Sequence, residues 1–102
     1  MKKIVLFCTG GMSTGILVNK IRQCVLERGL EIEIDAYGIS EIDKYGPEAD
    51  VILISPQVSF AEEEVRNKFP EKPIELIDME TYSMMKGEAV LNKCLEILGE
   101  DA

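Results

Sequence analysis

Short apolar runs alternate along the chain with longer stretches in which apolar residues recur every three or four positions. The short runs are typical of strands, and the longer periodic stretches are typical of helices. Four strands are predicted in this way, at Lys3–Phe7, Glu31–Tyr37, Asp50–Ile54 and Ile74–Ile77. Strands that are separated by helices pair in parallel through right-handed crossovers. The pattern therefore predicts an α/β fold, with residues 1–102 forming a single domain around one parallel sheet.

Four helices are expected, and glycine, proline or polar cap residues mark their ends. The first is a long helix that begins at Ser13–Gly15 and stops at Gly29, and the second is a short helix over Ser40–Tyr45 that Gly46-Pro47 closes. The third helix has capping-box spacing at Ser59 and Glu62 and stops before Pro70. The last helix covers Glu88–Leu98. Apolar stripes along the first and last helices predict their buried faces. The stripes are Ile16, Leu17, Ile21, Cys24 and Val25, and Val90, Leu91, Cys94, Ile97 and Leu98.

The strands differ in polarity, and this difference predicts their order in the sheet. The strands at Lys3–Phe7 and Asp50–Ile54 are continuously apolar, as expected of central strands that are buried on both faces. The other two carry charged residues and are expected at the edges. The predicted order is 2-1-3-4, an open four-stranded sheet flanked by helices. The carboxyl end of the first strand then faces the crevice where open α/β sheets bind ligands, and Cys8 lies there.

Composition and charge exclude several classes of protein. The 102 residues are 46% hydrophobic and 29% charged, which is ordinary for a globular domain. A net charge of −8 disfavours binding to nucleic acid or to anionic lipid. No apolar run approaches the ~20 residues of a membrane-spanning helix or the length of a secretory signal. We therefore expect a cytoplasmic protein with no nucleic-acid partner and no direct membrane insertion.

The chain has no histidine and three cysteines, Cys8, Cys24 and Cys94. Without histidine, a Ser/His or Cys/His catalytic pair and a histidine-ligated metal are impossible within this chain. The cysteine spacing fits neither a disulfide framework nor a CxxC zinc site, so we expect no metal and no cofactor. Cys24 and Cys94 fall on the apolar helical stripes and are predicted to be small core residues.

The segment Cys8–Gly15 carries the candidate chemistry. Gly10 and Gly11 allow the backbone to adopt positive φ and to turn several amide N–H groups inward. The helix that starts at Ser13–Gly15 adds free N–H groups and a dipole that attract an anion. Each charge-assisted bond of this kind contributes about 1.5–3 kcal/mol to holding phosphate. The same dipoles stabilise a thiolate at Cys8, which predicts in-line attack on phosphorus and a phosphocysteine intermediate.

The loop departs from two well-known phosphate-binding motifs. A Walker A motif requires Lys and Ser/Thr where this chain has Ile16 and Leu17. A cysteine phosphatase requires an arginine six residues after the cysteine, where this chain has Thr14, and no arginine occurs before Arg22. A loop without that arginine holds a phosphoryl group but lacks the main tool for hydrolysing it, which favours a carrier. A small cysteine-dependent phosphatase or arsenate reductase-like hydrolase, a non-catalytic anion-binding or redox-thiol module and a buried structural cysteine stay as alternatives.

The loop resembles the active loop of the lactose/cellobiose (chitobiose)-type enzyme IIB of the bacterial sugar phosphotransferase system. The resemblance rests on Cys8-Thr9-Gly10-Gly11-Met12-Ser13-Thr14 directly after an apolar first strand. It extends over nearly the whole chain, with support from Ala49-Asp50-Val51, Pro56-Gln57, Lys72-Pro73 and Ile77-Asp78. It implies a four-stranded parallel sheet with the topology of low-molecular-weight tyrosine phosphatases, in agreement with the predicted strand order.

The resemblance also implies a phosphoryl carrier that is an enzyme only together with its partners. Cys8 would accept a phosphoryl group from a phosphohistidine of enzyme IIA. It would then pass the group to a sugar of the cellobiose, chitobiose or lactose class that enters through the membrane component, enzyme IIC. Enzyme IIC would recruit the protein transiently to the inner face of the membrane. The residues expected to bind the phosphate are Thr9, Gly10, Gly11, Met12, Ser13, Thr14 and Gly15.

Two further polar residues are candidates for the border of the site, each with a structural alternative. Gln57 follows a central strand at the same edge of the sheet as Cys8, where it either borders the site or belongs to a proline turn. Asp78 also ends a strand at this edge. It either lies in the site, at the position of a phosphatase general acid, or caps a turn or helix.

An apolar docking surface is expected beside the loop. Met12 would project from it, helped by Ile16 or Val58, because transient partners need some affinity and fast release around one thiol. The acidic run Glu62-Glu63-Glu64 is expected to be a solvated helix face near its N-terminus, where carboxylates are favoured.

Overall fold

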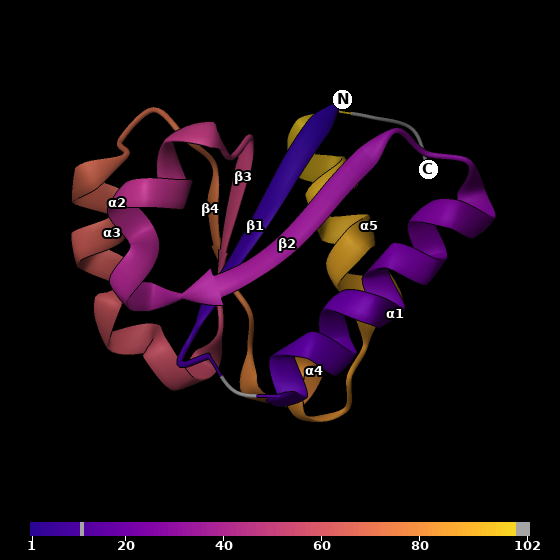
Figure 1. Ribbon diagram of the computed structural model, residues 1–102, viewed down its shortest axis with the longest axis horizontal. Helices are drawn as coiled ribbons and strands as arrows, with labels where there is room; N and C mark the ends of the chain where they lie inside the picture. The colour runs from indigo at the N-terminus through magenta and orange to yellow at the C-terminus, as the bar shows by residue number, and fades with distance from the viewer. Residues whose placement is uncertain (11, 100–102) are drawn as a thin grey trace.

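The computed structural model of the chain describes residues 1–10 and 12–99. Its strands are β1 (Lys2–Cys8), β2 (Ile32–Gly38), β3 (Val51–Ile54) and β4 (Ile74–Leu76). Its α-helices are α1 (Met12–Arg28), α2 (Ile42–Tyr45), α3 (Glu62–Lys68), α4 (Met79–Ser83) and α5 (Gly87–Leu98). Figure 1 shows three layers, in which α1, α4 and α5 lie on one side of the sheet and α2 and α3 on the other.

The strand order β2-β1-β3-β4 confirms the predicted sheet. All three pairings are parallel, and Ile4 at the centre pairs with Ile34 on one side and with Val51 on the other. Residues 4–8 of β1 are buried, as the continuous apolar run predicts for a strand that is covered on both faces. The central strand is therefore a fixed support for Cys8 at its end.

Two hydrophobic cores lie on opposite faces of the sheet, because successive side chains of a strand point to opposite faces. Ile4 and Leu6 face the core beneath α1 and α5, whereas Val5 and Phe7 face the core beneath α2 and α3. The larger core also contains Leu17, Val18, Ile21, Val25, Tyr82, Val90, Leu91, Cys94 and Leu95. The apolar stripes of the first and last helices thus lie where the sequence predicts them, with Cys94 fully buried and Cys24 half-buried.

Two details of the predicted helices are wrong. Ile16, a member of the predicted buried stripe, is 53% exposed, because α1 turns Leu17 and Val18 toward the sheet instead. Ser59 does not cap the third helix: residues 56–61 form 3-10 turns, and α3 begins at Glu62 after Ala61, which makes no side-chain cap bond. The short helix ends at Tyr45 with Gly46 as its C-cap, as predicted, and a 3-10 turn over Gly46–Glu48 follows it. The predicted stops of the first helix at Gly29 and of the third helix before Pro70 are confirmed.

One short helix, α4, is not predicted by the sequence pattern. Asp78 caps its N-terminus and accepts hydrogen bonds from the backbone N–H of Thr81 at 3.1 Å and from the Thr81 hydroxyl at 2.6 Å. These two bonds lower the pKa of Asp78 below its ordinary value, with the hydroxyl contributing most. The structural alternative for Asp78, that it caps a helix, is therefore what the structure shows.

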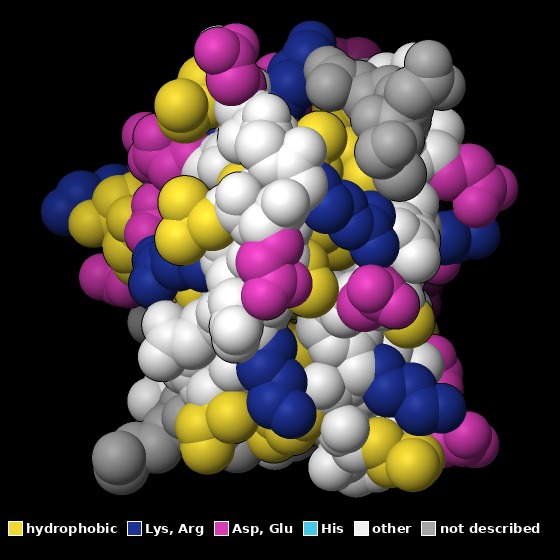
Figure 2. Space-filling model, turned by 90° about the vertical axis from the view of Figure 1, so that its right-hand side faces the viewer, with side chains coloured by type: hydrophobic (Ala, Val, Ile, Leu, Met, Phe, Trp, Pro, Cys, Tyr) yellow, Lys and Arg dark blue, Asp and Glu magenta, His cyan; other side chains and the backbone are white. Residues whose placement is uncertain are grey.

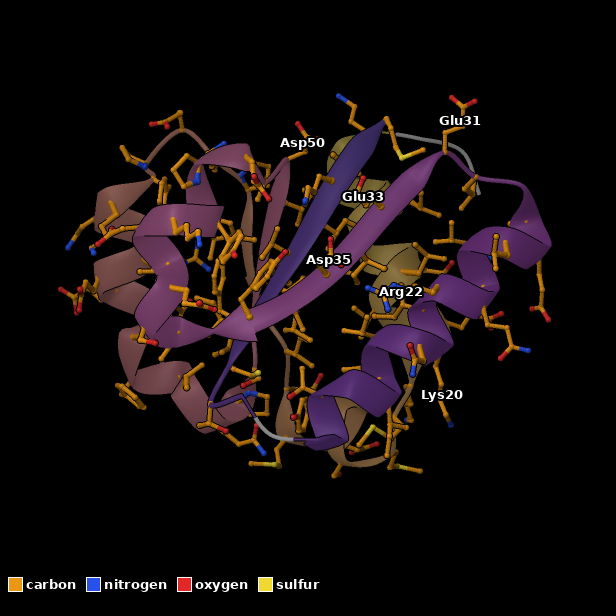
Figure 3. The ribbon with its side chains drawn as sticks, viewed as in Figure 1. Lys20, Arg22, Glu31, Glu33, Asp35 and Asp50 are labelled. Atoms are coloured by element: carbon orange, nitrogen blue, oxygen red, sulfur yellow. The ribbon has the colours of Figure 1, made fainter. Side chains whose placement is uncertain are left out.

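The edge strands are covered by arginines from the neighbouring helices. Arg22 of α1 donates from its Nε and Nη2 atoms to the carbonyl of Ile34 on β2, at 3.1 and 2.8 Å, and also pairs with Asp35. Figure 3 shows Arg22 reaching from α1 toward Asp35. Arg66 of α3 donates to the carbonyl of Ile74 on β4 at 3.1 Å. Each edge of the sheet therefore has one outward carbonyl that is occupied by a guanidinium.

Lys3 forms ion pairs with three carboxylates near the start of β1. Its ammonium lies 2.8 Å from Glu48, 3.1 Å from Glu33 and 3.6 Å from Asp35. Hydrogen bonds to Glu48 and Glu33 raise the pKa of Lys3. Part of the acidic charge of the chain is therefore neutralised locally, away from the carboxyl end of β1. Among the described residues, no helix combines the length and the apolar character that crossing a bilayer requires.

We expect Gly87→Ala to lower the free energy of unfolding by about 1–3 kcal/mol. A Cβ at Gly87 would lie 2.9 Å from the Cβ of Lys20 and 3.1 Å from the backbone N of Ile21, so α1 and α5 would have to move apart. The matched control is Gly15→Ala, whose Cβ would meet no atom within 4 Å. Because alanine favours helix by about 1 kcal/mol over glycine, the control is expected to be neutral or stabilising. Urea unfolding measures both, and equal effects would contradict this account.

We expect the Asp78 cap to make stability depend on pH. Because the pKa of Asp78 is lower in the folded chain than its ordinary value of 3.8, the cap stabilises the fold at higher pH. This contribution is lost as the pH falls through the lowered pKa. Asp78→Ala should therefore be less stable than the unsubstituted chain at pH 7, and this difference should shrink as the pH falls through the lowered pKa of Asp78. Asp78→Asn caps without titrating and is the control. A difference between Asp78→Ala and the unsubstituted chain that persists unchanged at low pH would contradict the assignment.

Candidate functional site

The candidate site lies at the carboxyl edge of the sheet, where β1 ends and α1 begins. Cys8 is the last residue of β1 and pairs with Gly38 of β2. In Figure 1 the connection from β1 to α1 lies at the lower edge of the molecule, close to α4. The position of Cys8 at the switch point of the sheet is thus as predicted, since β2 and β3 lie on opposite sides of β1.

The sulfur of Cys8 makes two hydrogen bonds with backbone groups. The N–H of Gly10 donates to Sγ at 3.1 Å, and Sγ donates to the carbonyl of Tyr37 at 3.6 Å. Gly10 has φ +98°, a conformation that a residue with a side chain rarely adopts, so the glycine allows the chain to turn directly after this amide.

The in-line attack predicted for Cys8 requires an accessible sulfur, and the observed conformation of the side chain differs from this. Cys8 is only 2% exposed, whereas Thr9 and Gly10 are exposed and form the outer part of the loop. The physical reason is the bond to Tyr37, which turns the sulfur toward β2. A hydrogen bond of 3.6 Å from a thiol is long and weak, so breaking this bond itself costs little.

The start of α1 provides free N–H groups beside Cys8. The helix is 17 residues long and begins at Met12, so the amides of its first three residues have no partner within the helix. Its first turn carries no acidic residue, whereas the first turn of α3 carries three. The dipole of α1 is therefore open to an external anion. Gly11 lies outside the described residues, as do the side chains of Met12 and Ser13.

Thr14 and Gly15 were both predicted to bind phosphate, and they differ in position. Thr14 is buried, and its Oγ1 lies 2.6 Å from the hydroxyl oxygen of Tyr82 on α4. Its hydroxyl is therefore directed into the protein, and only its backbone N–H lies among the free amides at the helix start. Gly15 is exposed and is the fourth helical residue, so its N–H follows the unpaired ones.

Gln57 and Asp78 lie at the same edge of the sheet and are engaged in local hydrogen bonds. The hydroxyl of Ser55 donates to Oε1 of Gln57 at 3.4 Å, and Gln57 is exposed in the turn after β3. Ser55 itself is fully buried, and its N–H donates to the carbonyl of Phe7. Asp78 is the α4 cap, and its lowered pKa keeps the carboxylate ionised at neutral pH. An ionised cap is unsuited to the role of general acid.

The arginine that follows Cys8 most closely in the sequence is engaged away from the loop. Arg22, the first arginine after Cys8, is bound to Ile34 and Asp35 near the middle of β2. In the described part of the chain, no three His, Cys, Asp or Glu side chains come together to hold a metal ion. Among the described residues, the donor that reaches the thiol of Cys8 is a backbone N–H group. The other cysteines differ, since burial raises the pKa of the Cys94 thiol to about 12.

Exposed apolar side chains lie on the elements around the loop. Ile16 near the start of α1 is 53% exposed, and Met79 and Met84, in and directly after α4, are 59% and 61% exposed. Figure 2 shows hydrophobic side chains along the lower edge of the face that carries α1 and α5, the edge at which α1 starts. Val58, the other predicted member of a docking surface, is only 1% exposed, because it packs in the core beneath α2 and α3. That part of the prediction is wrong.

Two contacts at the site were missed by reasoning from the sequence. The carbonyl of Tyr37 reaches the sulfur because β2 pairs with β1 in the register that places Gly38 beside Cys8. Tyr82 reaches Thr14 from α4, a helix of five residues that is too short to produce a periodic pattern. The cap pair of Asp78 and Thr81 was the one signal in the sequence that could have located this helix.

The sequence matches the family described as the lactose/cellobiose specific IIB subunit of the PTS system over residues 3–93. It is 39% identical over 97 residues to the galactose-specific EIIB component of Lactococcus lactis subsp. cremoris, covering 88% of this chain and 90% of that protein. It is 37% identical over 100 residues to the oligo-beta-mannoside-specific EIIB component of Bacillus subtilis, covering 96% of this chain and 97% of that protein.

Two solved structures have similar folds. The cellobiose-specific phosphotransferase IIB component from Borrelia burgdorferi superimposes with a TM-score of 0.76 at 31% identity, over 89% of this chain and 85% of that one. The lactose-specific IIB component domain from Streptococcus pneumoniae superimposes with a TM-score of 0.80 at 19% identity, over 93% and 95% of the chains, and supports the fold alone. The topology of low-molecular-weight tyrosine phosphatases is confirmed, and the hydrolase alternative is not favoured. The chain therefore belongs to the lactose/cellobiose-specific IIB subunits, the phosphoryl carriers of the sugar phosphotransferase system.

Proposed function

We propose that Cys8 is the residue that carries the phosphoryl group. The observation that supports this most directly is the N–H of Gly10, which lies 3.1 Å from Sγ at the carboxyl end of the central strand. The start of α1 follows within four residues and has no carboxylate in its first turn. One backbone donor thus contacts the sulfur and others follow at the start of α1, and they would equally bind the oxygens of a phosphoryl group attached to it.

The donor in this proposal is a phosphohistidine on enzyme IIA. The Cys8 thiol loses its proton to solvent, its side chain turns away from the Tyr37 carbonyl, and the thiolate attacks phosphorus in line. The S–P bond forms as the P–N bond breaks, and the imidazole nitrogen keeps the electron pair and takes up a proton. The loop amides, including those of Gly10 and of residues 12–14, stabilise the charge on the phosphoryl oxygens.

The acceptor is a sugar hydroxyl at the membrane component, enzyme IIC. The hydroxyl oxygen attacks phosphorus and its proton passes to solvent, while the S–P bond breaks and the thiolate leaves with its electron pair. The family is described as lactose/cellobiose specific, and its members include relatives named for galactose and oligo-beta-mannoside. We therefore assign the sugar only to a class, that of cellobiose, chitobiose or lactose. We place the protein at the inner face of the membrane while it contacts enzyme IIC. The docking surface would include Ile16, Met79 and Met84, together with Met12.

The positions of Arg22 and Asp78 explain why the phosphoryl group would be carried and not hydrolysed. Arg22 is engaged with β2, and Asp78 is an ionised helix cap, so neither supplies the clamp or the proton that a cysteine phosphatase needs. Water therefore has no base or acid from these positions to assist it. The group remains on sulfur until a partner supplies the acceptor.

We expect Cys8→Ser to abolish phosphoryl uptake, because a serine hydroxyl remains protonated at neutral pH and is a far weaker nucleophile. The measurement is the amount of label transferred from radiolabelled phospho-enzyme IIA, which should approach one phosphoryl per unsubstituted chain. Cys24→Ser applies the same change to a half-buried thiol that the site does not use, and it should be labelled like the unsubstituted chain. Label that persists in Cys8→Ser would show that another residue is the acceptor.

We expect the isolated protein not to turn over an aryl phosphate such as p-nitrophenyl phosphate. The arginine clamp of cysteine phosphatases is missing from the loop, so the transition-state charge of hydrolysis is not stabilised. Release of nitrophenolate is followed by absorbance, with Cys8→Ser as the background. Steady turnover that disappears in Cys8→Ser would favour the hydrolase alternative and contradict the carrier.

A further inference from the structure

We propose that Tyr82 is a positioning residue for phosphoryl transfer, which acts by holding Thr14 and thereby the first turn of α1. This inference rests on the proposed function of Cys8 and deepens it. Tyr82 does not touch the reacting atoms in this proposal. Its hydroxyl determines where the free amides of the loop point.

The contact between Tyr82 and Thr14 joins two segments that are 68 residues apart. The oxygens lie 2.6 Å from each other, at the short end of the range for hydroxyl–hydroxyl bonds. Both residues are buried, with exposures of 2% for Thr14 and 4% for Tyr82. Water does not compete for such a bond, and the low local dielectric strengthens it. Figure 1 shows α4 beside the beginning of α1, so the bond connects the two helices directly at the loop.

Thr14 is well placed to transmit this constraint to the loop. It is the third residue of α1, so its own N–H is among the unpaired donors at the helix start. Threonine has few side-chain rotamers, and a bond at Oγ1 fixes one of them and the rotation of the first turn. Only residues 9–11 connect Cys8 to this turn. The position of Thr14 therefore limits the directions that the intervening amides, including that of Gly10, can take.

The other end of the bond is held firmly, although α4 has only five residues. Asp78 caps the helix N-terminus, and the N–H groups of Met84 and Met85 close its other end on the carbonyls of Glu80 and Tyr82 at 3.0 and 3.1 Å. The ring of Tyr82 belongs to the large core beneath α1 and α5. The hydroxyl of Tyr82 is therefore held in a fixed position.

The chemistry of the pair favours positioning over stability. A Phe and a Val of nearly the same shape would fill this part of the core without polar atoms, and replacing both partners of a buried hydrogen bond by apolar groups is often nearly neutral for stability. Phosphoryl transfer, in contrast, depends on the placement of the donors to within about 1 Å, and misplacement by that distance costs up to about a hundredfold in rate. The directional bond between Thr14 and Tyr82 at the start of α1 provides this placement of the donors.

The experiment measures phosphoryl transfer from phosphorylated enzyme IIA to five variants of the full chain. They are Tyr82→Phe, Thr14→Val, the combination of both, Thr14→Ser and Val90→Ala. The rate is normalised to the folded fraction from urea unfolding, and the ³¹P chemical shift of the phosphorylated protein reports on the amides around the phosphoryl group. Val90→Ala is the matched control, because it removes apolar contacts from the same core without touching Thr14.

We expect Tyr82→Phe and Thr14→Val each to slow transfer about ten- to a hundredfold and to shift the ³¹P signal. The combined variant should be no slower than either alone, since both substitutions break the same bond. Thr14→Ser keeps the hydroxyl and should restore most of the rate. Val90→Ala should transfer at the unsubstituted rate for each folded molecule and leave the ³¹P signal in place.

Two results would overturn the inference while leaving Cys8 as the carrier. One is an unchanged rate and ³¹P shift in a folded Tyr82→Phe variant, and the other is losses that multiply in the combined variant. Failure of the unsubstituted chain to take up any label on Cys8 would instead overturn the proposed function. The two failures are thus separated by the same set of measurements.

Discussion

The burial of β1 at the centre of a parallel sheet is the constraint on which the site depends. Five consecutive residues of this strand are covered on both faces, and their backbone groups are paired with β2 on one side and β3 on the other. A strand held in this way has no freedom to slide, because a shift by one residue would exchange its two faces. The carboxyl end of β1 is therefore fixed, and so is the backbone of Cys8, its last residue.

The proposed phosphate site requires that local donors outweigh the charge of the whole chain. A net charge of −8 opposes the approach of phosphate, yet surface charges are screened beyond ~10 Å. Six of the acidic residues belong to other elements: three of them surround Lys3, and Glu62, Glu63 and Glu64 occupy the first turn of α3. The start of α1 has none. Of these two helix starts, only that of α1 is free of carboxylates of its own.

The fold could be predicted from the sequence because polarity distinguishes central strands from edge strands. The order of the sheet follows from Val51–Ile54 and β1 being continuously apolar, and Cys8 is placed by that order. The errors arise where local signals compete with tertiary contacts. Ser59 has the spacing of a cap but lies in 3-10 turns. Thr14 looks like a phosphate ligand, and its hydroxyl bonds Tyr82, which no local pattern connects to it. The inward rotation of the Cys8 sulfur likewise depends on a carbonyl of the neighbouring strand.

The arginines at the two sheet edges bear on how such a protein meets other chains. An open sheet presents unpaired carbonyls on its outer strands, and these can recruit a strand from another molecule. Here the carbonyls of Ile34 and Ile74 already accept bonds from Arg22 and Arg66. Extending the sheet through either edge would require breaking these contacts first. Occupation of these two carbonyls thereby disfavours irreversible strand exchange with another molecule.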